Sequence, residues 1–211
     1  MPPPSSAALK PRKQPRQARS QVTVDAVFEA TIQVLLSDGP QRLTTTRVAD
    51  RAGVSVGTLY QYYPNKQALL YAVLQRHLVR VGDSVEVAAR GAHRAPVSAM
   101  VAAVVEAFVR AKTEHIDEAR ALYGVAAELE SAELVKSVGK RNRAAISAML
   151  ATASDARFDD LALTSFMFSA AMVGPTRAMV EGGAPPRMLR ALRGQLESLC
   201  LSYLQREALL P

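Results

Sequence analysis

Apolar residues recur at helical spacing along most of this chain. Between Val24 and Leu35 they fall at every third or fourth position, which predicts a helix with one buried face. Asp38-Gly39-Pro40 then ends the pattern, because glycine adopts the left-handed conformation found at helix ends and proline cannot continue a helix. No stretch shows the alternation of apolar and polar residues that is typical of a strand, and no segment repeats.

Two short helices and one long helix are predicted next. A threonine of Thr44–Thr46 can cap a short helix that ends near Ala52, and Ser55 can cap a second one. Asn65 is the expected cap of a long helix that reaches about Ala88. These signals are local, because each cap satisfies backbone N–H groups only in the first turn of its own helix.

The rest of the chain consists of apolar runs at helical spacing, separated by short breaks. Pro96 suits the first turn of a helix. Four more helices are expected: a short one that contains Ile116 and Tyr123, and longer ones at about 130–151, 159–181 and 186–207. We therefore expect an all-α chain of about nine helices.

Positive charge is concentrated near the N-terminus. The 211 residues carry a net charge of +7, and residues 1–66 hold nine Lys and Arg against four Asp and Glu. Residues 1–20 are rich in proline, serine, glutamine and arginine, which predicts a disordered basic arm. This asymmetry favours a polyanionic partner, either nucleic acid or an anionic membrane surface. The arm lacks an amphipathic helix with aromatic residues, so a membrane-surface protein ranks below a nucleic-acid binder.

Several classes of protein are excluded by what the sequence lacks. Cys200 is the single cysteine, so no intrachain disulfide is possible and a disulfide-stapled extracellular fold is excluded. The longest uncharged apolar stretch, Leu161–Pro175, is shorter than the roughly 18 residues that a membrane-spanning helix needs. The N-terminus has no apolar stretch after its basic residues, so we do not expect a secretory signal. We expect a cytoplasmic protein.

Residues 44–63 have the pattern of a helix-turn-helix, two short helices joined by a tight turn that contains glycine. Gly53 suits the turn, and the small Ala49 and Ala52 allow the two helices to pack closely. The residues expected in the shared core are Val48, Val54 and Leu59, and those expected to face outward on the second helix are Val56, Gly57, Thr58, Gln61 and Tyr62. In this motif the second helix lies in the major groove of DNA, so its uncharged outer face is predicted to contact base pairs.

The stretch from Leu43 to Leu70 resembles the N-terminal domain of TetR-family transcriptional regulators. The resemblance rests on Ala-Gly-Val-Ser-x-Gly-Thr-Leu-Tyr, which begins at Ala52, and on the later tyrosines and Asn65-Lys66. It covers about residues 22–75, whereas the C-terminal two thirds agree with the family only in length and helical character. It implies a basic arm at 1–20, a three-helix helix-turn-helix DNA-binding domain at 21–66, and a helical ligand-binding and dimerisation domain at 67–211.

The resemblance also implies roles for individual residues. Thr45 and Thr46 would anchor the first motif helix on phosphates, and Arg47 would reach a base or a phosphate. The residues that would face base edges and the flanking backbone are Ser55, Val56, Gly57 and Thr58, with Gln61 beside them, and those that would grip phosphates are Tyr60, Tyr62 and Lys66. Tyr60 and Tyr63 as core aromatics, Lys66 as a solvated lysine and the arm as a solubilising tail remain open alternatives.

The last two helices are the expected dimer interface. The segment Leu161–Gly174 is apolar nearly all round, so it should be buried on more than one face. The resemblance implies a homodimer in which these helices form a four-helix bundle; the small residues that would allow close approach are Ala162, Ser165, Ser169, Ala170 and Gly174. A two-fold dimer would set two reading helices about 34–36 Å apart and favour a palindromic operator. The alternative is a monomer whose core takes up all of this apolar surface.

A small-molecule effector is the expected signal, since apolar pockets between helices are common ligand sites. The residues expected to line the pocket are Phe108, Tyr123, Asn142, Met149, Phe166 and Met167, although such a stripe is also typical of a plain core. Asn142 lies within an apolar stripe, and a buried polar group there needs a partner, which could be a backbone carbonyl, a water or a ligand. Few basic residues lie in the apolar stripes, which favours a neutral, lipophilic effector.

An enzyme is the main rival class. The three histidines, His77, His93 and His115, have no metal-type spacing, and the chain contains no nucleophile elbow, phosphate loop or dinucleotide fingerprint. We therefore expect no catalysis, no cofactor and no metal. The prediction is a transcriptional regulator, in which a repressor dimer is released from operator DNA by an effector. A constitutive DNA binder or an activator without a small-molecule switch is the alternative.

Overall fold

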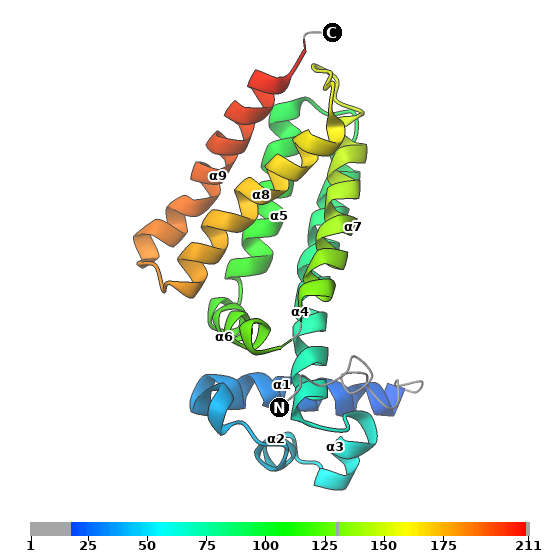
Figure 1. The fold of residues 1–211 in the computed structure, drawn as a ribbon, viewed down its shortest axis with the longest axis vertical. Helices are drawn as coiled ribbons and strands as arrows, with labels where there is room; N and C mark the ends of the chain where they lie inside the picture. The colour runs from blue at the N-terminus through cyan, green and yellow to red at the C-terminus, as the bar shows by residue number, and fades with distance from the viewer. Residues whose placement is uncertain (1–17, 130, 210–211) are drawn as a thin grey trace. The chain divides into compact units, whose positions relative to one another are not determined.

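The computed structural model describes residues 18–129 and 131–209, and within them the expected all-α fold is confirmed. The nine helices of this part of the chain are α1 (Ala18–Arg42), α2 (Thr45–Ala52), α3 (Val56–Tyr62), α4 (Lys66–Gly91), α5 (Val97–Thr113), α6 (Ile116–Glu128), α7 (Ala132–Leu150), α8 (Leu161–Glu181) and α9 (Pro186–Glu207) (Figure 1). Most of the arm predicted at residues 1–20 lies outside the described residues.

The helices belong to two compact units. The first comprises the described part of Met1–His77 together with Asp117–Ser131, and the second comprises Leu78–Ile116 with the described part of Ala132–Pro211. The expected boundary at residue 66 differs from this division. The reason is that α4 is one continuous helix that contributes to both units, and that α6 is tied to the first unit by Gln41, which donates to Glu128 at 3.1 Å.

Local sequence signals set the helix starts of the first unit. The side chains of Thr44, Ser55 and Asn65 each accept a hydrogen bond from the backbone N–H three residues further on, at 3.2, 2.9 and 2.7 Å. Each bond satisfies one of the N–H groups that lack a partner at a helix start. All three expected caps are confirmed.

The break predicted after the first helix occurs at Gly39. Its φ of 77° and ψ of 167° lie outside the helical region, and α1 resumes for a short turn through Pro40 to Arg42. A positive φ is accessible to glycine without steric cost, which explains the residue at this position. The kink leaves carbonyl groups near the end of α1 available to side chains from other helices.

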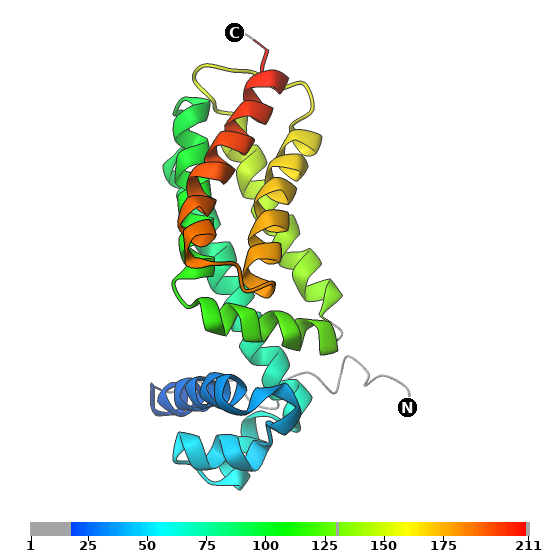
Figure 2. The same cartoon turned by 90° about the vertical axis from the view of Figure 1, so that its left-hand side faces the viewer.

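The second unit is a helical bundle. Its helix α8 packs beside α7 and α9, and α9 packs against α5 (Figures 1 and 2). The buried side chains of its core include Met100, Val104, Phe108, Ile146, Met149, Phe168, Leu196 and Cys200. Burial raises the pKa of the Cys200 thiol to about 11, so the reactive thiolate is scarce at neutral pH. No helix among the described residues has the length and apolar character needed to cross a membrane.

Candidate nucleic-acid interface

Helices α2 and α3 form the predicted helix-turn-helix. Gly53 ends α2 in the left-handed conformation, with φ 66° and ψ 30°, and its N–H donates to the carbonyl of Asp50 at 3.2 Å. Residues with a Cβ adopt this conformation at a steric cost, so the turn selects glycine. Val48, Ala49 and Leu59 are completely buried, and they form the shared core of the two helices.

Most residues expected to contact DNA are accessible on α2 and α3. The exposed ones are Thr46, Arg47, Ser55, Gly57, Tyr60 and Gln61, and the partly exposed ones are Thr45, Val56 and Thr58. The hydroxyl oxygens of Thr45 and Tyr60 are 3.0 Å apart, and those of Ser55 and Thr58 are 2.9 Å apart. The first pair joins the start of α2 to α3, so the reading helix is held to its neighbour by a polar contact as well as by the core.

Tyr62 does not face outward, so that expectation is wrong. Its side chain is only 8% exposed, and its ring centroid lies 6.4 Å from that of Tyr63, which in turn lies 5.7 Å from that of Phe28. Tyr62 and Tyr63 follow Leu59 by three and four positions, and on a helix this spacing places them on the face of the buried leucine. Burial also raises the pKa of Tyr63 well above its ordinary value.

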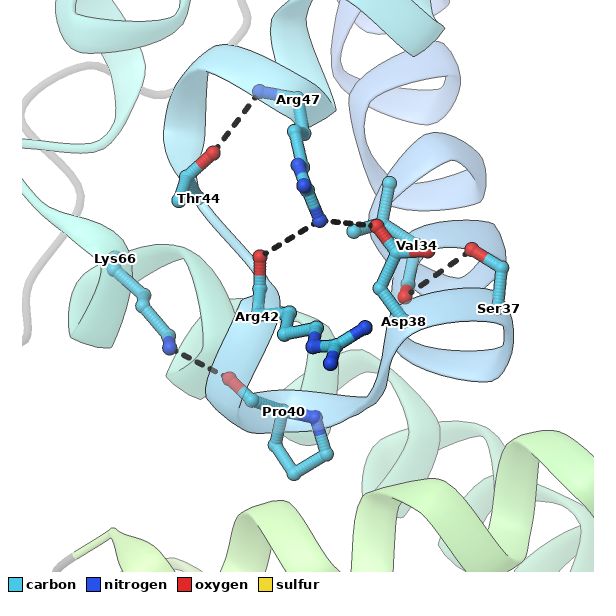
Figure 3. A network of polar contacts seen from close by, with 8 residues as sticks. All are labelled: Val34, Ser37, Asp38, Pro40, Arg42, Thr44, Arg47 and Lys66. Atoms are coloured by element: carbon cyan, nitrogen blue, oxygen red, sulfur yellow. Dashed lines mark hydrogen bonds and ion pairs between the residues drawn. The ribbon is translucent and has the colours of Figure 1, made fainter.

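Arg47 and Lys66, which are expected to contact DNA, form polar contacts with groups near the end of α1 (Figure 3). Arg47 Nη1 lies 2.7 Å from a carboxylate oxygen of Asp38 and donates to the carbonyl of Arg42 at 3.4 Å. Lys66 Nζ donates to the carbonyl of Pro40 at 2.7 Å. Both carbonyls lie beyond the Gly39 kink. Arginine offers five donors and the lysine ammonium three, so each side chain keeps donors for a phosphate.

The six residues expected to line a ligand pocket belong to different units and differ in burial. Phe108 and Met149 are buried in the second unit, and Asn142 is partly exposed on α7 of the same unit, whereas Tyr123 lies on α6 in the first unit. Phe166 and Met167 are 51% and 43% exposed on α8, so they do not line the interior of the single chain. Periodicity does not distinguish the faces of α8, because this helix is apolar nearly all round.

Lys112 is a buried base that the sequence analysis missed. It lies on α5 among apolar residues and is 6% exposed. Burial lowers the pKa of Lys112 from its ordinary 10.5 to about 8, and the nearby charge of Arg80 lowers it as well. Lys112 follows the buried Phe108 by four positions, so it lies on the same face of α5. This spacing was the signal in the sequence that could have predicted its burial.

We expect the stability of the variant Lys112→Met, measured relative to that of the parent protein, to be about 3 kcal/mol greater below pH 8 than above pH 10.5, because burial opposes only the charged form of the parent lysine. Below pH 8 Lys112 is protonated in the folded protein, and burial of this charge lowers the free energy of unfolding. Between pH 8 and 10.5 the unfolded chain binds more protons than the folded chain, so the free energy of unfolding of the parent rises with pH. Urea unfolding at a series of pH values measures both proteins. An advantage of the variant that stays constant through this window contradicts the prediction.

The glycine turn, the buried core of α2 and α3, and the accessible outer face of α3 define a DNA-binding protein of the helix-turn-helix class. Comparisons with known proteins narrow this class. The family described as bacterial regulatory proteins, tetR family, matches residues 27–73, and the family described as tetracyclin repressor-like, C-terminal domain, matches residues 96–204. The chain belongs to the tetR family of bacterial regulatory proteins.

Curated relatives resemble the chain only near its N-terminus. The nucleoid occlusion factor SlmA of Actinobacillus pleuropneumoniae is 40% identical over 67 residues, which cover 31% of each protein. The HTH-type transcriptional repressor KstR of Mycobacterium tuberculosis is 40% identical over 55 residues, which cover 26% of this chain and 25% of KstR. The matched region thus spans less than a third of these relatives, and their names describe only them.

Solved structures share the fold over nearly the whole chain. A putative TetR-family regulator from Mesorhizobium loti aligns with a TM-score of 0.71 at 16% identity and covers 92% of this chain and 100% of its own. The fatty acid degradation regulator FadR from Bacillus halodurans aligns with a TM-score of 0.65 at 20% identity and covers 84% of this chain and 97% of its own. The family and the fold indicate a regulatory DNA-binding protein rather than an enzyme.

Proposed function

We propose that this protein is a homodimeric repressor that binds a palindromic operator and is released from it by a small, lipophilic effector. The observation that carries the proposal is the accessible outer face of α3, which a buried Leu59 and the Ser55 cap hold in a fixed orientation. A repressor of bacterial genes would act in the cytoplasm, where the chromosome is. The name of the relative KstR supports repression rather than activation.

The reading face has a chemistry that favours apolar contacts to bases. Val56 and Gly57 offer no side-chain hydrogen bonds, so we expect them to lie against thymine methyl groups. Thr58 and Gln61 are the side chains of α3 that can hydrogen-bond to base edges. Phosphate contacts from Thr45, Thr46, Arg47, Tyr60 and Lys66 would set the register of the protein on the duplex.

A second copy of the chain is the proposed occupant of the outer face of α8. Four large apolar side chains are exposed there, namely Leu163, Phe166, Met167 and Val173. The small Ala162, Ala170 and Gly174 share this face, whereas Ser165 is buried inside the unit and cannot serve a partner helix. Large apolar patches on a surface mark interaction sites. Met188 and Leu199 are also exposed, on α9, which packs beside α8.

The proposed switch uses α4, which runs without a break from Lys66 to Gly91 through both units. An effector that binds one position of α4 better than another shifts the population between them and changes the separation of the two reading helices. A coupling free energy of about 1–3 kcal/mol would weaken operator binding roughly 5–150-fold. Equal separation of the reading helices in the operator-bound and effector-bound proteins would refute this mechanism.

Selection of bound duplexes from a random DNA pool tests the proposed function. We expect a palindrome whose half-sites are about one helical turn apart. An effector screen with this palindrome as the probe then separates a switchable repressor from a constitutive DNA binder. Recovery of no consensus, with binding that disappears as salt rises, would leave only non-specific attraction to DNA.

We expect Lys66→Ala to weaken binding about equally for operator and random DNA. Loss of one phosphate contact should lower the slope of log K against log salt by about one unit. Titration at several salt concentrations measures this slope, with the exposed Lys140→Ala as the matched control and thermal melting to exclude damage from loss of the Pro40 contact. A loss confined to the operator would instead show that Lys66 reads bases.

A further inference from the structure

Helices α4 and α7 approach each other closely at Gly82, within the second unit. A methyl group placed on Gly82 would lie 3.1 Å from Asn142 Oδ1, 3.1 Å from Val138 Cγ1 and 3.4 Å from Arg141 Nη2. Contacts of 3.1 Å are too short for a side chain unless its neighbours move. The absence of a Cβ at Gly82 is therefore what lets the Asn142 side chain lie against α4.

Asn142 Oδ1 is buried at this contact and has no hydrogen-bond partner among the described residues. The backbone of α4 does not supply one, because the N–H groups inside a helix are used by its own carbonyls. A buried oxygen without a donor destabilises the folded state by about as much as a lost hydrogen bond. Groups of this kind in folded proteins need an explanation, such as a role in function.

The surroundings of this oxygen limit what can reach it. Val81 and Val85 on α4 and Ile146 on α7 are close to Gly82 and Asn142 in the sequence and belong to one buried hydrophobic cluster. The bulk of a ligand would therefore meet apolar side chains. Only a group with an N–H or O–H can satisfy the oxygen, which excludes ethers, esters and carboxylates. A hydroxyl both donates and accepts, so it can pair with either end of the Asn142 amide.

Charged residues border the same contact. Arg141, next to Asn142, forms ion pairs with Asp83 and Glu86, which flank the Gly82 side of α4. A methyl group on Gly82 would already press on Asn142 and Val138, so a donor that reaches Oδ1 from the Gly82 side requires α4 and α7 to separate. Separation would also strain the Arg141 ion pairs, so occupancy of the site and the position of α4 are linked.

We propose that Asn142 Oδ1 is the hydrogen-bond acceptor for a neutral, mostly apolar effector that carries a hydroxyl, and that the effector inserts between α4 and α7 at Gly82. This inference rests on the proposed function, since it names the chemistry of the effector and the point where it moves α4. It also explains why a polar side chain occupies the apolar stripe of α7.

Matched pairs of probes test the chemistry. Phenol, naphthol and decanol are each compared with their methyl ethers, which keep the apolar part and lose the donor. We expect at least one alcohol to raise the melting temperature of the protein and to shift the NMR signal of the Asn142 side-chain amide, identified by its absence in Asn142→Leu. The ether should bind about fivefold more weakly, as expected for one lost hydrogen bond.

Variants of Asn142 and Gly82 test the position of the proposed binding site. Asn142→Leu and Gly82→Ala should each abolish the preference for the alcohol, the first by removing the acceptor and the second by filling the approach to it. Gly91→Ala on the same helix is the control, because a methyl group there meets no atom within 4 Å, and it should bind as the parent does. Without ligand, Asn142→Leu should melt at a higher temperature than the parent.

Four outcomes would overturn the proposal: no alcohol binds, ether and alcohol bind equally, the preference survives in Asn142→Leu, or Asn142→Leu melts at a lower temperature without ligand. Operator binding is measured separately. An alcohol that binds through Asn142 but leaves operator affinity unchanged would uphold the site and refute the switch.

Discussion

Replacement of Phe166 by glutamate is expected to turn the proposed dimer into monomers and to abolish tight operator binding. The side chain is 51% exposed in the single chain, so the fold of the subunit should tolerate the change. In a two-fold interface the substitution occurs twice, and it would place two carboxylates in an apolar contact, where an unpaired buried charge is strongly unfavourable.

The loss of DNA affinity should be large, because a monomer engages only one half-site. Joining two half-site contacts in one dimer raises affinity by about 100-fold or more without any new contact, and the monomer forfeits this gain. Sedimentation velocity measures the oligomeric state, and titration of the selected palindrome measures the affinity.

Val87→Glu is the matched control for this experiment. Val87 is also an exposed apolar residue of the second unit, but it lies on α4 rather than on the face of α8. We expect this variant to remain dimeric. A dimeric Phe166→Glu variant, or a monomeric Val87→Glu variant, would show that the interface lies elsewhere.

Replacement of Leu59 by alanine is expected to unfold the DNA-binding unit far more easily. Leu59 is 0% exposed and joins α3 to α2, and removal of a buried leucine side chain destabilises a protein by about 2–5 kcal/mol. This is a large share of a total stability of about 5–15 kcal/mol. Operator binding should fail at temperatures where the parent still binds, because α3 loses the contact that orients it.

Thermal and urea unfolding, followed by circular dichroism, measure this effect. Leu36→Ala is the control, since Leu36 is an exposed leucine of α1 in the same unit and its loss should change stability by no more than about 0.5 kcal/mol. If both leucines proved equally costly, or equally cheap, the assignment of Leu59 to the shared core would be wrong.

The parts of the site that follow local rules could be predicted from the sequence. The caps by Thr44, Ser55 and Asn65 involve backbone groups three residues away, so a short stretch of sequence contains both partners. The turn at Gly53 and the kink at Gly39 likewise depend on the backbone conformation of a single residue. These signals located α2, α3 and the start of α4.

Other features of the structure depended on which helix packs against a given helix face, and this cannot be read from the local sequence. Tyr62 lies on the same face of α3 as Leu59. A helix of only seven residues is too short for the sequence pattern to show which of its faces is buried. Lys112 lies on a buried stripe of α5, and only the packed structure shows that its charge is covered. The partners of Arg47 and Lys66 are carbonyls at the end of α1, which the kink at Gly39 brings within reach.

The sequence by itself therefore determined the helices, their ends and the helix-turn-helix, because propensity, capping and periodicity act over one or two turns of chain. Only the tertiary structure decided that Phe166 and Met167 face outward, that α6 belongs with the first unit, and that Asn142 Oδ1 is buried against Gly82 with no donor among the described residues. Periodicity states which residues share a face, whereas burial depends on what covers that face, and the covering helix is distant in sequence.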